Sequence, residues 1–70
     1  MNDIVAVSVE LFPVRYPGYI EASELLHEYE FWLNQNKMDY VLKHTSGSTM
    51  PTHVVLDPES SVVFRLRFGL

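Results

Sequence analysis

The stretch that decides the fold is Ile20–Gln35, IEASELLHEYEFWLNQ, in which apolar residues recur at helical spacing. One stripe of a helix would gather the apolar residues Ala22, Leu25, Leu26, Tyr29, Trp32 and Leu33. Such a stripe is typical of an amphipathic helix that packs one face on a core. Glu21, Glu24 and Glu28 share one edge of this helix, and we expect that edge to be exposed and acidic.

Strand patterns lie on both sides of this helix. Ile4–Leu11 alternates apolar and small or polar residues with a period of two, and its β-branched content favours a strand. Met38–His44 has the same alternation. Pro51–Leu56 and Ser61–Phe68 are predicted to form a hairpin around Asp57-Pro58-Glu59-Ser60, because Asp followed by Pro favours a type I turn. The second strand of this hairpin is expected from an alternation, in which Val62, Phe64, Leu66 and Phe68 lie on one side and Val63, Arg65 and Arg67 on the other.

The order of these elements is β-α-β-β-β, within a single domain of residues 1–70. It predicts an α+β fold of two layers, with a four-stranded mixed sheet and one helix on one face. The covered face should hold the valines, Leu56 and Phe64. The open face should carry a mixed surface of Glu10, Lys43, His53, Val55, Val63, Arg65 and Arg67.

Composition narrows the class of protein. A 70-residue chain has a thin core, since a domain of this size buries only roughly 60% of its unfolded surface. The absence of Cys excludes disulfides and fits a reducing compartment. The formal charge of -4 argues against nucleic acid as a partner. No signal peptide or membrane-spanning run is evident, so we expect a cytoplasmic protein without a membrane partner.

The order of motifs resembles a shortened thioredoxin or glutaredoxin domain. Tyr16-Pro17-Gly18-Tyr19 stands where that family has its C-P-x-C loop, and Thr49–Asp57 is similar to its proline-containing run before a closing hairpin. The resemblance implies a cis bond before Pro51 and a peptide or small-ligand site formed by Tyr16, Tyr19, Met50 and Pro51. Both redox positions are tyrosines, which excludes the thiolate chemistry of the family.

Catalytic and metal-binding motifs are incomplete. His27-Glu28 begins the H-E-x-x-H pattern of zinc proteases, but Phe31 occupies the second ligand position. His44 and His53 flank the polar loop Thr45–Thr49, and two histidines are too few for a zinc site. That loop has a glycine but no following Lys or helix, as a phosphate loop requires. We therefore expect no catalytic residue, no metal and no cofactor.

Two surfaces are candidate sites for a partner. On the helix, Phe31 lies nearly opposite the core stripe, beside Glu24, His27 and Glu28. Either it is exposed for a protein partner or the Phe12–Tyr19 loop folds over it. On the sheet, Lys43, Arg65 and Arg67 form a basic patch, which is either a solvated surface or a site for an acidic partner or the acidic helix of a second copy.

These observations predict a small non-enzymatic protein that binds a protein partner as an inhibitor or adaptor, a type that bacteriophages often encode. The alternative is a redox-inactive thioredoxin-like protein that binds a peptide or small ligand near Pro51. An enzyme is a weaker hypothesis. A structural subunit, dimeric through the open face or edge of its sheet, is also open.

Overall fold

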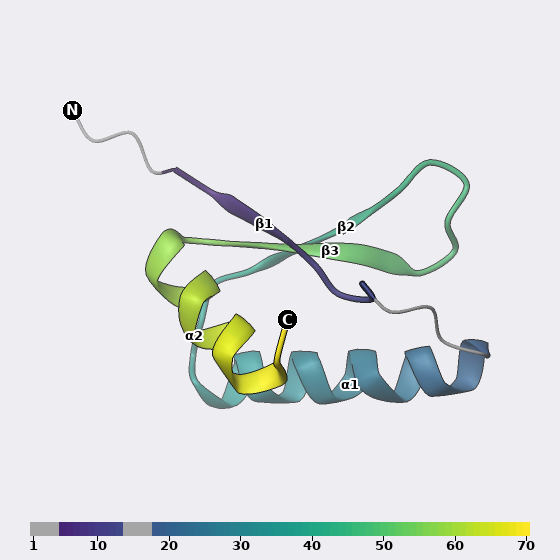
Figure 1. Ribbon diagram of the computed structural model, residues 1–70, viewed down its shortest axis with the longest axis horizontal. Coiled ribbons are helices and arrows are strands. Elements are labelled where there is room, and N and C mark those ends of the chain that lie inside the picture. The colour runs from purple at the N-terminus through teal and green to yellow at the C-terminus, as the bar shows by residue number, and fades with distance from the viewer. Residues whose placement is uncertain (1–4, 14–17) are drawn as a thin grey trace.

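The computed structural model describes residues 5–13 and 18–70, apart from the side chain of Tyr19. Along the chain it contains β1 (Val7–Glu10), α1 (Tyr19–Gln35), β2 (Val41–His44), β3 (Pro51–Leu56) and α2 (Pro58–Phe68). The three strands form one layer and both helices lie on the same side of it (Figure 1). The expected two-layer α+β class is confirmed. No helix in the described part of the chain has the length and apolarity needed to cross a membrane.

The sheet has the strand order β1-β3-β2, with β3 antiparallel to both neighbours. β2 and β3 form the hairpin, and Gly47, with a φ of 83°, lies in the loop that joins them. α1 connects β1 to β2 across the helix side of the sheet. The predicted mixed sheet of four strands is therefore wrong, because the described residues form a sheet of three strands in which both pairs are antiparallel.

The segment Ser61–Phe68, predicted to be a strand, belongs to α2. Asp57 is the N-cap and its carboxylate accepts a hydrogen bond from the Ser60 amide, at 3.2 Å, while Pro58 begins the helix. At the other end Gly69 adopts a left-handed conformation, with a φ of 68°. Asp-Pro-Glu-Ser thus starts a helix here, although the same residues suit a turn. The predicted hairpin of Pro51–Leu56 with Ser61–Phe68 is wrong for this reason.

The core lies between the sheet and the helices. Its buried members are Val9, Leu11, Leu26, Tyr29, Leu33, Val54, Leu56 and Phe64. The α1 stripe predicted from the sequence is confirmed, since Leu26, Tyr29 and Leu33 are buried. Phe64 is buried as expected, but it reaches the core from a helix one turn before Phe68.

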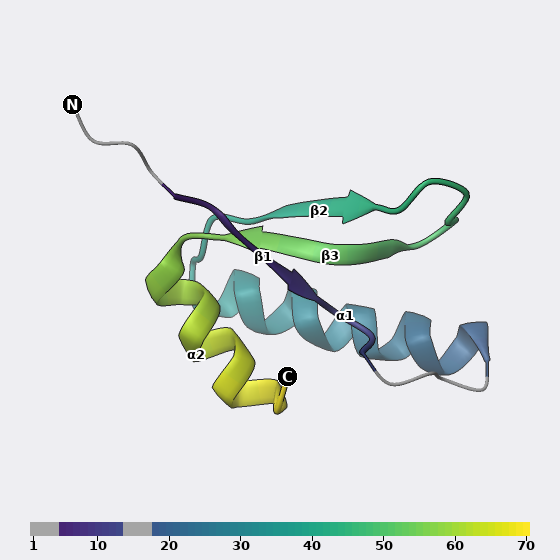
Figure 2. The ribbon, with the colours of Figure 1, turned by 45° about the horizontal axis from the view of Figure 1, so that its top comes forward.

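Ring contacts join the two helices within this core. The Tyr29 ring meets Phe64 at a centroid distance of 5.3 Å and Phe68, edge-on, at 4.7 Å. The Tyr29 hydroxyl donates a 2.7 Å hydrogen bond to the carbonyl of Leu11, just after β1. One tyrosine of α1 therefore ties the sheet and α2 together. Figure 2 shows α2 beside α1, below the end of β3.

Candidate functional site

A groove of about 330 Å³ runs between α1 and α2. It is lined by His27, Glu28, Phe31 and Trp32 of α1 and by Arg67 and Phe68 of α2. Three of the four helix residues predicted for partner binding thus line one groove, and an arginine expected on the opposite face of the molecule joins them. The fourth, Glu24, is exposed one turn before Glu28 on the same side of α1.

Helical spacing explains how the groove is built. His27, Glu28 and Phe31 repeat at three- and four-residue intervals, which places them on one side of α1. Trp32, on the core-facing boundary of that side, packs edge-on against Phe68 at a centroid distance of 5.8 Å. Trp32 and Phe68 are both half-buried. They form an apolar floor that is fixed by the aromatic core beneath it.

The rim of the groove combines apolar surface with both signs of charge. Phe31 is 66% exposed. The Phe12–Tyr19 loop, which the second alternative places over Phe31, lies largely outside the described residues. The guanidinium carbon of Arg67 lies 4.9 Å from the centroid of the Phe68 ring, a cation–π arrangement that holds the arginine above the floor. Glu28 supplies the negative charge. A groove of this kind suits an apolar side chain flanked by polar ones.

The chain has no significant match among protein families, curated proteins or solved structures. Its function must therefore be inferred from the geometry of its own surfaces.

The predicted basic patch does not form. Lys43 is on the open face of the sheet, but Arg65 and Arg67 lie on α2, in the other layer. The two arginines point to different sides of α2, because Arg67 lines the groove with α1 whereas Arg65 lies beside β1. Val63 also lies on α2. Alternate residues of Ser61–Phe68 would share one face of a strand, but this segment is part of a helix. On a helix, Arg65 and Arg67 point in different directions.

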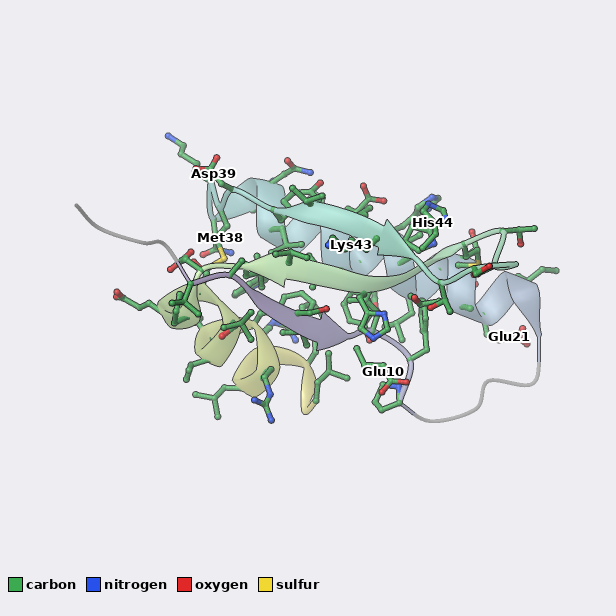
Figure 3. The ribbon with its side chains drawn as sticks, turned by 90° about the horizontal axis from the view of Figure 1, so that it is seen from above. Glu10, Glu21, Met38, Asp39, Lys43 and His44 are labelled. Carbon is green, nitrogen blue, oxygen red and sulfur yellow. The ribbon has the colours of Figure 1, made fainter. Side chains whose placement is uncertain are left out.

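The open face of the sheet carries a row of ionisable side chains. The sequence predicted that they lie on this face but not which of them are neighbours. His53 of β3 is opposite Glu10 of β1 on one side and Lys43 of β2 on the other. Figure 3 looks onto this face, with Glu10 and Lys43 labelled. Val55 lies on the same face, as expected. The register of the strands, which the sequence alone does not reveal, brings these groups together.

Hydroxyl groups extend this row toward the hairpin loop. The Thr52 hydroxyl lies 2.8 Å from Nδ1 of His53 and 2.6 Å from the hydroxyl of Thr45. A hydroxyl beside an imidazole is the minimum arrangement for a nucleophile and its base. Neither Thr52 nor His53 lines the groove between the helices. The bond between Thr45 and Thr52 instead ties the two sides of the hairpin together near its loop.

His44 and His53 do not join a larger set of metal ligands. Among the described residues no group of three or more His, Asp and Glu side chains is close enough to hold a metal ion. β2 has an irregularity between Lys43 and His44, where the pairing skips to Pro51. The two histidines therefore do not occupy directly paired positions.

The ligand site implied by the thioredoxin resemblance is not assembled by the described residues. Tyr16 lies outside them, as does the side chain of Tyr19. No described peptide bond is cis, so the bond before Pro51 is trans, contrary to that implication. The backbone carbonyl and amide of Met50 both bond to the hydroxyl of Ser48, at 2.6 and 3.3 Å. The closing hairpin after Pro51 is replaced by β3 followed by α2.

Proposed function

We propose that this chain is a non-enzymatic protein that binds a protein partner, as an inhibitor or adaptor, through the groove between α1 and α2. The observation that carries the proposal is the exposed Phe31 beside the apolar floor of Trp32 and Phe68. Aromatic residues and arginine are enriched where interfaces gain most of their binding energy. The groove offers both, since Arg67 stands over Phe68.

Several features support an interaction rather than a reaction at this groove. Its polar residues, His27, Glu28 and Arg67, are exposed to solvent, as the rim of a protein interface is. The floor is rigid, because the rings of Trp32 and Phe68 contact the buried Phe64 at 5.9 and 5.0 Å. A rigid floor lowers the entropy lost on binding. The alternative of ligand binding near Pro51 has less support, since Ser48 already bonds Met50.

The experiment is affinity capture from the native host with the tagged chain, followed by quantitative mass spectrometry. Phe31→Ala should lower the recovery and affinity of a specific partner by about tenfold or more, as expected for an interface anchor. Ile20→Ala is the matched control, because Ile20 is 72% exposed on the same helix but does not line the groove. Recovery should be unchanged for that variant.

The charged rim provides a second readout. Glu28→Lys should reduce the rate of association and change its salt dependence, because rim charges steer encounter more than they hold the complex. A partner that binds wild type, Phe31→Ala and Glu28→Lys equally well would show that the groove is not the binding surface. Reproducible turnover of a substrate by the purified chain would overturn the non-enzymatic assignment.

A further inference from the structure

One edge of the sheet is open along β1. Among residues 5–13 and 18–70, β1 pairs with β3 alone, and the Leu11 amide continues that ladder with a 2.9 Å hydrogen bond to the carbonyl of Thr52. Backbone groups of an antiparallel strand point alternately to either side. The backbone amide of Leu11 points toward β3, so the backbone groups of Val7 and Val9 point the same way. The backbone amides and carbonyls of Ser8 and Glu10 therefore point away from β3. β1 thus presents a short row of backbone donors and acceptors.

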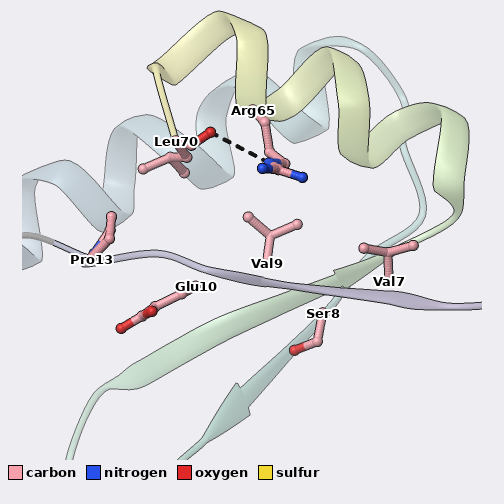
Figure 4. Close-up of a pocket in the computed structure, with 7 residues that line it drawn as sticks. All are labelled: Val7, Ser8, Val9, Glu10, Pro13, Arg65 and Leu70. Carbon is pink, nitrogen blue, oxygen red and sulfur yellow. Dashed lines mark hydrogen bonds between the residues drawn. The ribbon is translucent and has the colours of Figure 1, made fainter.

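α2 lies beneath this edge and extends beyond it. Figures 2 and 3 both show α2 on the outer side of β1, away from β3. A groove of about 290 Å³ separates β1 from α2 (Figure 4). Val7, Val9 and Pro13 line it from the β1 side, and Arg65 and Leu70 line it from the α2 side.

The outer side of α2 continues this groove. A smaller hollow of about 180 Å³ is lined by Val62, Arg65, Leu66 and Leu70, so both hollows share Arg65 and Leu70. Leu66 is 79% exposed and Val62 is 55% exposed. In two-layer folds, helices bury their apolar side chains against a sheet. Here these side chains flank the position that another strand beside β1 would occupy.

We propose that β1 accepts an extended segment of a partner protein as a fourth strand, with α2 beneath it. The backbone of Ser8 and Glu10 would pair with the incoming strand, as in β-augmentation. Alternate side chains of that strand would point toward α2, onto Val62, Leu66 and Leu70. We name this acceptor, formed by Val7–Glu10 and the outer side of α2, the β1 edge site.

Charge defines the chemistry of the segment. Arg65 lies within the groove, and its Nε donates a long hydrogen bond, 3.4 Å, to the Leu70 carbonyl. An acidic side chain on the helix side of the incoming strand would therefore be favoured beside Arg65. Glu10, which points to the open face, favours a basic side chain on the other side. The segment combines apolar residues at alternate positions with an acidic residue among them.

A single strand fits the β1 edge site better than a second copy of this chain. Two-fold pairing of β1 with itself would bring both α2 helices under the same junction, because α2 extends beyond the edge. It would also bring the two Arg65 side chains toward each other. An extended segment carries no helix of its own at the edge and avoids both conflicts.

The test uses a displayed library of random 12-residue peptides, selected against the purified chain. We expect selected peptides to alternate apolar residues and to contain Asp or Glu. Ser8→Pro should weaken their binding by about tenfold or more, since it removes an outward amide while leaving the bonds to β3 intact. Leu66→Ser and Arg65→Glu should also weaken it. Val63→Ser, on the α1 side of α2, is the matched control and should not.

Two further measurements use the unaltered chain, so a variant that fails to fold cannot affect their result. Peptides that are N-methylated at alternate residues should lose binding to the unaltered chain, because methylation blocks strand pairing. Bound peptide should also slow hydrogen exchange at the Ser8 and Glu10 amides. The proposal fails if no peptide is enriched, or if Ser8→Pro and N-methylation leave binding unchanged. It also fails if the chain forms a concentration-dependent dimer that Ser8→Pro abolishes, because a second copy would then occupy the edge.

The β1 edge site is independent of the groove between the helices. Phe31→Ala should leave the selected peptides bound with unchanged affinity, because Phe31 lines the groove between the helices and not the groove beside β1. Loss of peptide binding in Ser8→Pro with retention in Phe31→Ala would assign the peptides to the edge. The reverse result would assign them to the helix groove and overturn the edge proposal.

Discussion

A single residue, Tyr29, connects the sheet and the helices of this small domain. Tyr29 is 1% exposed, and its hydroxyl is bonded to the carbonyl of Leu11 while its ring contacts α2. A buried carbonyl that loses its donor has no access to water and keeps the cost of desolvation. A single hydroxyl therefore contributes to the attachment of the chain that leaves β1.

Replacement of Tyr29 by Phe should lower the free energy of unfolding by about 1–3 kcal/mol, because it leaves the Leu11 carbonyl without this donor and preserves the ring. Urea denaturation followed by circular dichroism measures the change. Tyr40→Phe is the control, since the Tyr40 hydroxyl makes only longer bonds, 3.3 and 3.5 Å, near the surface. Equal losses in the two variants would contradict the role assigned to Tyr29.

Asp57 links the stability of α2 to pH. Hydrogen bonding with Ser60 lowers the pKa of the Asp57 carboxyl below its ordinary value of 3.8. A carboxyl whose pKa is lower in the folded state stabilises that state above pH 3.8 and loses the contribution as pH falls through the lowered value. The charge of Asp57 also favours the positive N-terminus of α2.

We therefore expect wild type to unfold at a higher temperature than Asp57→Asn at neutral pH. The advantage should shrink and vanish toward about pH 2, because Asn caps a helix nearly as well but does not titrate. Thermal denaturation across this range at low salt measures the difference. A difference that stays constant with pH would show that the Asp57 charge does not contribute.

At the scale of elements, α2 depends on cooperation between its caps and one buried ring. Asp57, Pro58 and Gly69 define its ends, while Ser61 and Phe64 are its fully buried residues. Three of its large apolar side chains, Val62, Val63 and Leu66, are exposed. A helix of 11 residues is marginal in isolation, so packing has to hold it.

Phe64→Ala should remove about 3–5 kcal/mol, the usual cost of emptying a buried aromatic site. A domain of this size has little more than that to lose, so cooperative unfolding should be largely abolished. Val63→Ala changes a 43% exposed residue of the same helix and should cost under about 1 kcal/mol. Urea titrations of the two variants make the comparison. Similar small losses would show that α2 is not anchored through Phe64.

At the scale of the whole molecule, the central position of β3 organises the sheet. β3 pairs on both sides, whereas β1 and β2 are edges. The buried Val54 and Leu56 of β3 face the helices, and His53 and Val55 face the open side. The sheet is therefore protected on one face and open on the other, within the described part of the chain.

Hydrogen exchange measured by NMR should follow this plan. Amides of His53–Leu56 should exchange slowest, because these residues pair with the neighbouring strands in the centre of the sheet. In β1 the Val7 and Val9 amides should be protected and those of Ser8 and Glu10 should exchange rapidly. Uniform protection along β1 in the free chain would show that its edge is already covered. Protection that rises with protein concentration would identify a second copy there.

The patterns that depend on neighbours along the chain were predictable. The amphipathic helix expected at Ile20–Gln35 and the strand expected at Pro51–Leu56 both correspond to observed elements and to the faces expected of them. The side of α1 that carries His27, Glu28 and Phe31 also followed from helical spacing. At Ser61–Phe68 two local patterns conflicted. Apolar alternation favoured a strand, and the caps at Asp57 and Gly69, which were present in the sequence, favoured the helix that forms.

Contacts between distant segments were beyond the sequence. Which helix faces Phe31, which strand lies between β1 and β2, and which way each arginine points all depend on how the layers pack. Packing depends on how rings such as Tyr29, Phe64 and Phe68 are buried against one another. These contacts join residues that have no fixed spacing along the chain. Local periodicity determined the first four elements of this protein, from β1 to β3. Tertiary packing decided that the last one is a helix and placed Arg67 in one groove and Arg65 in another.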